Sequence, residues 1–186
     1  MIVPGVGDSG PGHWQTLWQS RMPGALRVVQ DDWSLCDAAS WDARLEEVVS
    51  RLAQPAVLIA HSAGAVTVAR WASRPGASVQ RVAGAYLVAP PDFDALLPEG
   101  FPGPEGVRDL GWSPMPRSAL PFPALVVASC TDPFDRLLRT KTHAEAWGAA
   151  FLDAGELGHI NLASGQGPWP QGWGWFEEFL ERLTRG

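Results

Sequence analysis

The sequence predicts an α/β protein in which helices cover both faces of a mostly parallel sheet of about six strands. Three continuous apolar runs, at residues 56–60, 82–88 and 124–128, are typical of strands that are buried on both faces of a sheet. Segments with apolar residues at helical spacing lie between these runs. Because strands that alternate with helices are joined by right-handed crossovers, we expect the strands to run parallel.

The expected elements follow one another along the whole chain. In chain order, we expect strands at residues 2–3, 26–29, 56–60, 82–88, 124–128 and 150–152, and helices at residues 14–20, 40–52, 65–72, 135–147 and 173–183. A glycine-rich turn at residues 5–10 ends the first strand. In the helix at residues 40–52, Trp41 and Leu45 lie at helical spacing with charged residues between them. Pro55 ends this helix.

A tightly packed helix is expected after the strand at residues 56–60. Residues 65–72 are apolar at nearly every position, which suits a helix packed closely on the sheet. A cluster of prolines at residues 89–123 indicates a long connection between two strands, and residues 173–183 form a closing amphipathic helix. A length of 186 residues favours one domain, spanning residues 1–186.

Charge and composition argue against several functions. The chain has 14 Lys and Arg against 20 Asp and Glu, a net charge of −6 that would repel a nucleic-acid backbone. The first residues lack a basic stretch before an apolar run, and no segment approaches roughly 20 consecutive apolar residues. We therefore expect a cytoplasmic protein with no nucleic-acid or membrane partner. Cys36, Cys130 and the histidines show no metal-ligand spacing, so we expect reduced thiols and no bound metal.

Ser62 is the candidate nucleophile. Residues 60–64, AHSAG, match the G-x-S-x-G turn that exposes a nucleophilic serine, except that Ala60 replaces the first glycine. The segment follows a buried strand and precedes a helix, which is the context that the motif requires. A simple turn from strand to helix is the alternative interpretation.

A serine hydroxyl needs a base that accepts its proton. In hydrolases with this turn the chain order is serine, acid and histidine, and both His143 and His159 follow Ser62. His143 lies in the middle of a predicted helix, where we expect a solvent-exposed histidine. His159 lies in a flexible loop after the last strand, from which it can reach the carboxyl edge of the sheet. We therefore predict that His159 is the base.

Three carboxylates compete to orient the base. Asp132 lies in the loop that follows the strand ending near Ser129, at the carboxyl end of the sheet, and is our choice. Asp135 is better explained as an acid at the start of a helix. Asp153 shares a loop with His159 and has less freedom to meet the far ring nitrogen, so it is the second candidate.

Two backbone amides are candidates for an oxyanion hole, the pair of donors that stabilises a developing negative oxygen. The N–H of Ala63 lies at the start of the helix that follows the serine, where the helix dipole favours negative charge. The second donor is expected from the loop after the first strand, where glycines permit close approach of the backbone, and we select Val6. A simple turn is again the alternative.

These residues lie in segments that resemble a small serine-hydrolase family of the α/β-hydrolase superfamily, which includes retinoblastoma-binding protein 9 and the bacterial YdeN-type proteins. The resembling segments are VPGVGDSGPGHWQTLW, DDW, LIAHSAGA, YLVAPPD, VVASCTDPF and GELGHINLASGQGPWPQGW, and they extend nearly from end to end. The resemblance implies an α/β-hydrolase fold without a cofactor. It also implies that Ser62 is the nucleophile, His159 the general base and acid, and Asp132 the orienting carboxylate.

The resemblance further implies a substrate class and a set of binding residues. A small ester, thioester or amide is the expected acyl substrate, with activity of the carboxylesterase type. His13, Trp14 and Trp169 would border the mouth of the site; aromatic packing under a long loop is the alternative role for them. Residues 89–123 would act as a reduced lid, with no separate cap domain. Binding to retinoblastoma protein is not implied, because the required LxCxE-type motif is absent.

Two other functions agree with the same sequence. The chain could be a binding or scaffold protein that keeps the hydrolase fold without useful turnover, since fold does not prove function. It could also transfer an acyl group to a nucleophile other than water. The sequence makes no prediction of the oligomeric state.

Overall fold

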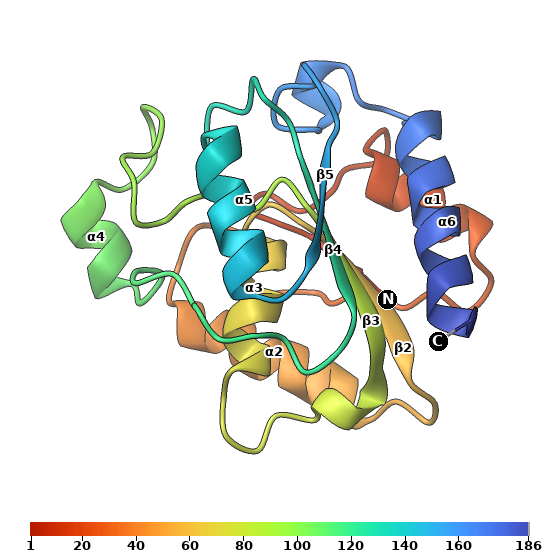
Figure 1. The fold of residues 1–186 in the computed structure, drawn as a ribbon. Coiled ribbons are helices and arrows are strands. Elements are labelled where there is room, and N and C mark those ends of the chain that lie inside the picture. The colour runs from red at the N-terminus through yellow and green to blue at the C-terminus, as the bar shows by residue number, and fades with distance from the viewer. Residues whose placement is uncertain (186) are drawn as a thin grey trace.

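Five parallel strands form one sheet, in the order β1-β2-β3-β4-β5, within residues 1–185, which are the residues that this computed structural model describes (Figure 1). The strands are β1 (Ile2–Val3), β2 (Ala56–His61), β3 (Val82–Val88), β4 (Ala124–Ala128) and β5 (Ala150–Asp153). Because all five are parallel, their carboxyl ends meet at one edge of the sheet. The α/β class and the parallel sheet predicted from the sequence are confirmed.

Helices pack on both faces of this sheet. They are α1 (Trp14–Arg21), α2 (Ala38–Ser50), α3 (Ala63–Ala72), α4 (Pro104–Asp109), α5 (Leu137–Ala146) and α6 (Pro170–Arg185), with short 3₁₀ turns η1 (Val79–Arg81) and η2 (Leu162–Ser164). Figure 1 shows α1 and α6 on one side of the sheet, and α2, α3 and α5 on the other. None of the helices in residues 1–185 is both long enough and apolar enough to span a bilayer.

One of the six predicted strands, at residues 26–29, is not formed. The segment lies beside β1, where Ile2 N–H donates to the Leu26 carbonyl (2.8 Å) and Val28 N–H donates to the Ile2 carbonyl (2.9 Å). These bonds form a single parallel bridge. Since β1 has only two residues, it offers too few partners for a longer ladder, and Leu26 and Val29 remain exposed.

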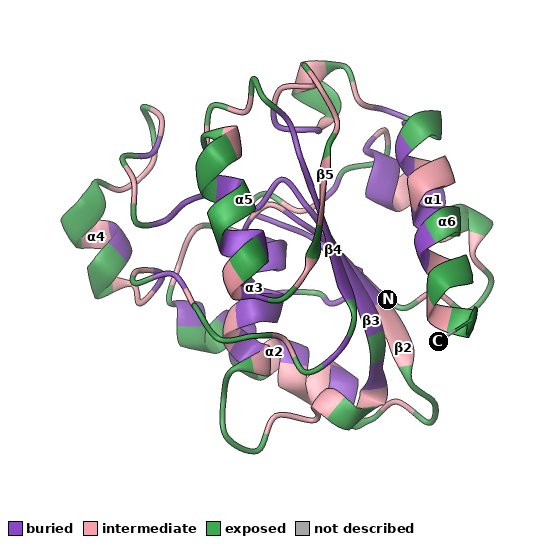
Figure 2. Ribbon diagram, in the orientation of Figure 1, coloured by how far each residue is buried: buried purple, intermediate pink, exposed green. Residues whose placement is uncertain are grey.

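Two apolar clusters fill the spaces between the sheet and its helices. Figure 2 shows β3 and β4 coloured mostly as buried, with exposed residues on the outer sides of the helices. Successive strand residues alternate between the two clusters: Leu58 and Ala60 belong to the cluster under α2 and α3, while Ile59 belongs to the cluster under α1 and α6. The second is an aromatic cluster, whose buried rings are Trp14, Trp18, Tyr86, Trp169, Phe176 and Phe179. Burial on both faces explains why β2, β3 and β4 are continuous apolar runs.

The prediction of a solvent-exposed His143 is wrong. Only 3% of this residue is exposed, because α5 turns it toward the connection between β3 and β4. Its ring stacks on Trp147 with the ring centres 5.9 Å apart, and its Nε2 lies 3.4 Å from a carboxylate oxygen of the fully buried Asp92. His143 therefore makes a buried polar contact with Asp92, although its neighbours in the helix are polar.

Candidate functional site

Ser62 occupies a sharp turn between β2 and α3. Its φ and ψ of 55° and −131° are unusual for a residue with a side chain, and its N–H donates to the Val88 carbonyl (2.9 Å). Gly64 permits the tight passage of the backbone, because a Cβ there would lie 2.4 Å from the carbonyl oxygens of Val3 and Pro4. The local structure is the strand–turn–helix arrangement that the sequence predicts around Ser62.

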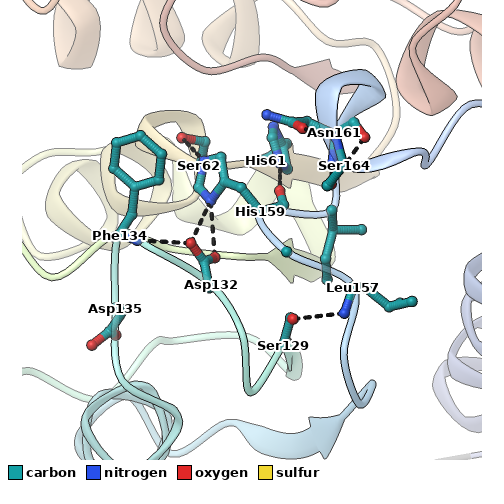
Figure 3. A network of polar contacts seen from close by, with 12 residues as sticks. His61, Ser62, Ser129, Asp132, Phe134, Asp135, Leu157, His159, Asn161 and Ser164 are labelled. Atoms are coloured by element: carbon teal, nitrogen blue, oxygen red, sulfur yellow. Dashed lines mark hydrogen bonds and ion pairs between the residues drawn. The ribbon is translucent and has the colours of Figure 1, made fainter. Parts of the chain in front are cut away.

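The three side chains selected from the sequence form a continuous hydrogen-bonded chain (Figure 3). Ser62 Oγ lies 2.8 Å from His159 Nε2. Nδ1 of the same ring lies 2.9 Å from each carboxylate oxygen of Asp132. The side chains of His159 and Asp132 are only 9% and 5% exposed, so the pair is shielded from water.

Two loops carry the acid and the imidazole, and we name them by these residues. The acid loop, residues 129–136, joins β4 to α5, and the base loop, residues 154–161, follows β5. Within the acid loop, Phe134 N–H donates to Asp132 Oδ1 (2.9 Å), and the Phe134 ring centre lies 4.3 Å from that of His159. These contacts fix the carboxylate and cover one side of the imidazole.

Side-chain hydroxyls join the two loops. Ser129 Oγ accepts a hydrogen bond from Leu157 N–H (2.9 Å; Figure 3), and Thr131 Oγ1 accepts one from Gly158 N–H (3.0 Å). Asp153, the second candidate for the acid, is exposed and accepts a bond from Gly155 N–H (2.8 Å). The geometry therefore brings Asp132, and not Asp153, to the imidazole.

The two predicted oxyanion donors lie beside the serine. Val6 and Ala63 both line the cavity that contains Ser62. As the first residue of α3, Ala63 has no carbonyl partner within its helix, and Val6 N–H has no hydrogen-bond partner among residues 1–185. A Cβ at Gly5 would lie 2.7 Å from the Ser62 Cβ, so a glycine is needed for the first loop to approach the serine.

A cavity of about 280 Å³ opens over Ser62. Its wall is largely apolar, and the connection between β3 and β4 contributes four of the lining residues: Pro91, Phe93, Leu97 and Phe101. From the base loop and η2 come His159, Asn161, Leu162 and Ala163. A carbonyl compound with a short apolar chain could fit against such a wall.

His13 also lines this cavity, as predicted for a binding residue. Its Nδ1 accepts a hydrogen bond from Gln15 N–H (3.2 Å), at the start of α1. Burial, with a smaller effect from Arg27 and His159, lowers the pKa of His13 to about 4. The ring is therefore neutral at pH 7, and because Nδ1 accepts, the proton is on Nε2.

Trp14 and Trp169 do not line the cavity, which corrects their predicted place at its mouth. Both are buried in the aromatic cluster, with ring centres 5.2 Å apart. Trp18 packs on both rings, at 4.6 Å from Trp14 and 5.7 Å from Trp169. Aromatic packing, the alternative role, describes these two residues, because α1 turns Trp14 toward α6 rather than toward the serine.

His61 lies directly before Ser62, and no role was predicted for it from the sequence. The residue is 5% exposed, lines the cavity and has its Nε2 2.9 Å from the backbone carbonyl of His159. Burial first, and then the neighbouring His159 and His13, lower the pKa of His61 well below its usual range. Its place at the end of a buried strand was the available sequence signal.

The remaining thiols and ligand-type side chains lie apart from this site. Cys36 and Cys130 are free thiols, and neither lines the cavity. Across residues 1–185, no group of three or more His, Cys, Asp and Glu side chains is arranged to hold a metal ion. Ser62 and His159 both line the cavity and lie within hydrogen-bond distance of each other.

Comparisons with known proteins agree with this architecture. The chain matches the crystal structure of a YdeN-like hydrolase from Pectobacterium atrosepticum with 32% identity and a TM-score of 0.80, over 98% of this chain and 90% of that one. The ydeN gene product of B. subtilis matches with 18% identity and a TM-score of 0.70, over 100% and 97% of the chains. A thermophilic esterase from Thermogutta terrifontis matches with 16% identity and a TM-score of 0.65, over 98% and 89%.

The last two similarities concern the fold alone, because the identities are low. No curated protein matches the sequence. The family model described as serine hydrolase matches residues 1–178, which is nearly the whole chain. The predicted resemblance is confirmed, and the chain belongs to the serine hydrolase family.

Proposed function

We propose that this protein hydrolyses a small ester, thioester or amide through an acyl-enzyme on Ser62, with activity of the carboxylesterase type. The observation that carries the proposal is the hydrogen-bonded chain from Ser62 Oγ through the His159 ring to the Asp132 carboxylate. A serine hydroxyl is a weak nucleophile unless an adjacent base takes its proton, and a third group must orient that base. All three groups are within 2.9 Å of their partners.

In the first half-reaction, Ser62 Oγ attacks the substrate carbonyl carbon as His159 Nε2 takes the hydroxyl proton. The carbonyl oxygen becomes negative, and the N–H groups of Val6 and Ala63 donate to it. Asp132 stabilises the imidazolium that forms. When the tetrahedral intermediate collapses, His159 returns the proton to the leaving alcohol, thiol or amine, and the acyl group stays on Ser62.

The second half-reaction repeats these steps with water. His159 takes a proton from water, whose oxygen attacks the acyl carbon, and the same two amides donate to the second oxyanion. Collapse breaks the bond to Ser62 Oγ, which recovers its proton from His159. The carboxylic acid leaves, and the enzyme returns to its starting state without a cofactor.

The cavity favours short, uncharged acyl groups. Its volume of about 280 Å³ and its apolar side chains, including Phe93 and Phe134, suit a small hydrocarbon chain better than a charged one. The neutral His13 offers a ring N–H as a hydrogen-bond donor in the same cavity. We therefore expect esters of acetate and butyrate to be better substrates than long-chain or dicarboxylic esters.

Labelling with a fluorophosphonate tests the proposed nucleophile. The wild-type protein should form one adduct, which peptide mass spectrometry locates on Ser62. Both Ser62→Ala and His159→Ala should abolish it, while circular dichroism shows that the variants remain folded. p-Nitrophenyl acetate, butyrate and decanoate then rank the acyl chains. If folded wild-type protein remains unlabelled, the catalytic assignment is wrong, and a binding protein with the hydrolase fold becomes the better reading.

A further inference from the structure

The backbone directly after the proposed base has an unusual conformation. Ile160 has a φ of +47° and is fully buried. A β-branched residue rarely adopts the left-handed region, because its side chain crowds the backbone. Such a conformation persists only where the surrounding structure determines it, so something must hold the base loop in this shape.

Two buried ring N–H groups contact this part of the loop from distant places in the sequence. His61 Nε2 lies 2.9 Å from the His159 carbonyl oxygen, and Trp14 Nε1 donates to the Ile160 carbonyl oxygen at 2.8 Å. Because a carbonyl can only accept, the His61 proton must be on Nε2. The donors come from the end of β2 and the start of α1, so two separate elements hold successive peptide groups.

Neither carbonyl has another donor within residues 1–185. A buried carbonyl without a partner is costly, so the loop conformation that gives both carbonyls a partner is strongly favoured. The flanking residues are held separately: Asn161 Oδ1 accepts from Ser164 N–H (3.0 Å), and Leu157 N–H donates to Ser129 (2.9 Å). The two ring donors therefore act on the segment that sets the direction of the imidazole.

We propose that His61 and Trp14 are positioning residues, which hold the carbonyls of His159 and Ile160 and thereby aim the imidazole at Ser62. This inference rests on the proposed function, since it assigns these two residues to the geometry of the proposed base. Rotation of either peptide group would swing the ring away from the 2.8 Å contact between Nε2 and Ser62 Oγ.

The neutral character of both donors suits this task. His159 must carry a positive charge in each half-reaction, and a lysine or arginine beside its backbone would oppose that charge. An indole N–H is uncharged at every pH at which the protein folds. The His61 ring, packed 5.0 Å from the His159 ring, is kept neutral by its burial. The two ring donors thus hold the base loop without opposing the protonation of His159.

Matched variants separate positioning from packing. Trp14→Phe and Trp18→Phe remove the same atoms from neighbouring rings of the aromatic cluster, but Trp18 Nε1 donates to Pro168 and not to the base loop. His61→Leu removes the ring donor, whereas the amide of His61→Gln can still donate to the His159 carbonyl. Each full-length variant is assayed for its rate of fluorophosphonate labelling and for kcat and KM with p-nitrophenyl acetate.

We expect Trp14→Phe and His61→Leu to lower kcat and the labelling rate by about tenfold to a hundredfold, with KM nearly unchanged. Trp18→Phe should react like the wild type, and His61→Gln should recover most of the rate lost in His61→Leu. Crystal structures of the slow variants should show a longer distance between His159 Nε2 and Ser62 Oγ.

Failure of this inference differs from failure of the proposed function. If the wild type labels on Ser62 but Trp14→Phe and His61→Leu label as fast as Trp18→Phe, the positioning role is overturned. The same holds if His61→Gln is as slow as His61→Leu. Should Trp14→Phe not fold, the His61 pair decides the question alone. An unlabelled wild type would instead overturn the proposed function.

Discussion

The base loop and the acid loop meet at the same hydrogen bond, but they are held in different ways. Uncharged ring N–H groups from His61 and Trp14 contact the base loop. Charged groups surround the acid loop: the buried Asp92 donates its N–H to the Phe134 carbonyl (3.1 Å), and its carboxylate lies 2.7 Å from Arg139. In the proposed mechanism the imidazole changes charge and the carboxylate does not, so the groups that hold the two loops can differ.

Burial and neighbouring groups have opposite effects on the carboxylate pKa values of Asp92 and Asp135. Burial raises the pKa of Asp92, but the nearby His143 ring and the hydrogen bonds from Arg139 and from Asp94 N–H outweigh it, and the net pKa lies below the usual value. Asp135 has no basic hydrogen-bond partner on its carboxylate; burial raises its pKa to about 6, despite a hydrogen bond from Thr140. We therefore expect Asp135 to make the acid loop less stable as the pH rises, whereas the buried neutral His61 makes the base loop less stable as the pH falls.

The largest expected effect comes from removing the charge of the proposed acid. Asp132→Asn should lower kcat by about 10³- to 10⁴-fold, because the amide favours the wrong imidazole tautomer and cannot stabilise an imidazolium. Steady-state hydrolysis of p-nitrophenyl acetate measures this loss. Asp153→Asn is the matched control and should keep full activity. Equal losses in the two variants would contradict the assignment of Asp132.

Loss of the Asp92 carboxylate should have the next largest effect, on stability. Asp92→Asn leaves the buried His143 and the half-exposed Arg139 without their anion, and should lower the free energy of unfolding by about 2–3 kcal/mol. Urea denaturation at pH 7 measures the change. The surface pair of Arg185 with Glu181 provides the control, because Glu181→Gln should change stability very little. If Asp92→Asn is as stable as the wild type, the Asp92 carboxylate does not stabilise the acid loop.

Asp135 should make the protein less stable as the pH rises, whereas a carboxylate in an ion pair would make it more stable. Its folded-state pKa of about 6 lies above the ordinary value of 3.8, so the folded protein holds a proton that the unfolded chain has lost. This contribution to stability is present below pH 4 and disappears as the pH rises through 6. The difference amounts to at most about 3 kcal/mol.

Urea denaturation of wild type and Asp135→Asn from pH 4 to pH 7 tests this sign. The wild type should lose stability relative to the variant as the pH rises, whereas at pH 4 both carry a neutral side chain and should differ least. A gap that stays constant over this range would show that Asp135 does not titrate there.

The smallest expected effect comes from Trp169, whose indole N–H does not donate to the base loop or the acid loop. Trp169 Nε1 is buried without a hydrogen-bond partner among residues 1–185. Trp169→Phe should therefore cost only about 1 kcal/mol of stability, from lost ring volume, and leave the labelling rate unchanged. Thermal unfolding and fluorophosphonate labelling measure both quantities. A slow Trp169→Phe variant would mean that the aromatic cluster as a whole, rather than the Trp14 N–H, controls the base loop.

Errors in the sequence-based predictions arose where the outcome depended on contacts between distant segments. Residues 26–29 have a strand-like composition, but the two-residue β1 beside them cannot support a ladder. His143 has polar neighbours in its helix, but the packing of α5 buries it beside Asp92. Trp14 follows His13 directly, yet the two point into different places, one into the aromatic cluster and the other into the cavity.

Residues that are close together in the chain were enough to predict the alternation of strands and helices, the strained turn at Ser62, and the candidates His159 and Asp132. These are local properties, because apolar runs, turn residues and positions after strands can be read from neighbours in the chain. The packing of distant segments was needed to show which carboxylate contacts the imidazole, and that His61 and Trp14 contact the base loop. Those contacts join residues 27, 98 and 146 positions apart, and no local pattern encodes such distances.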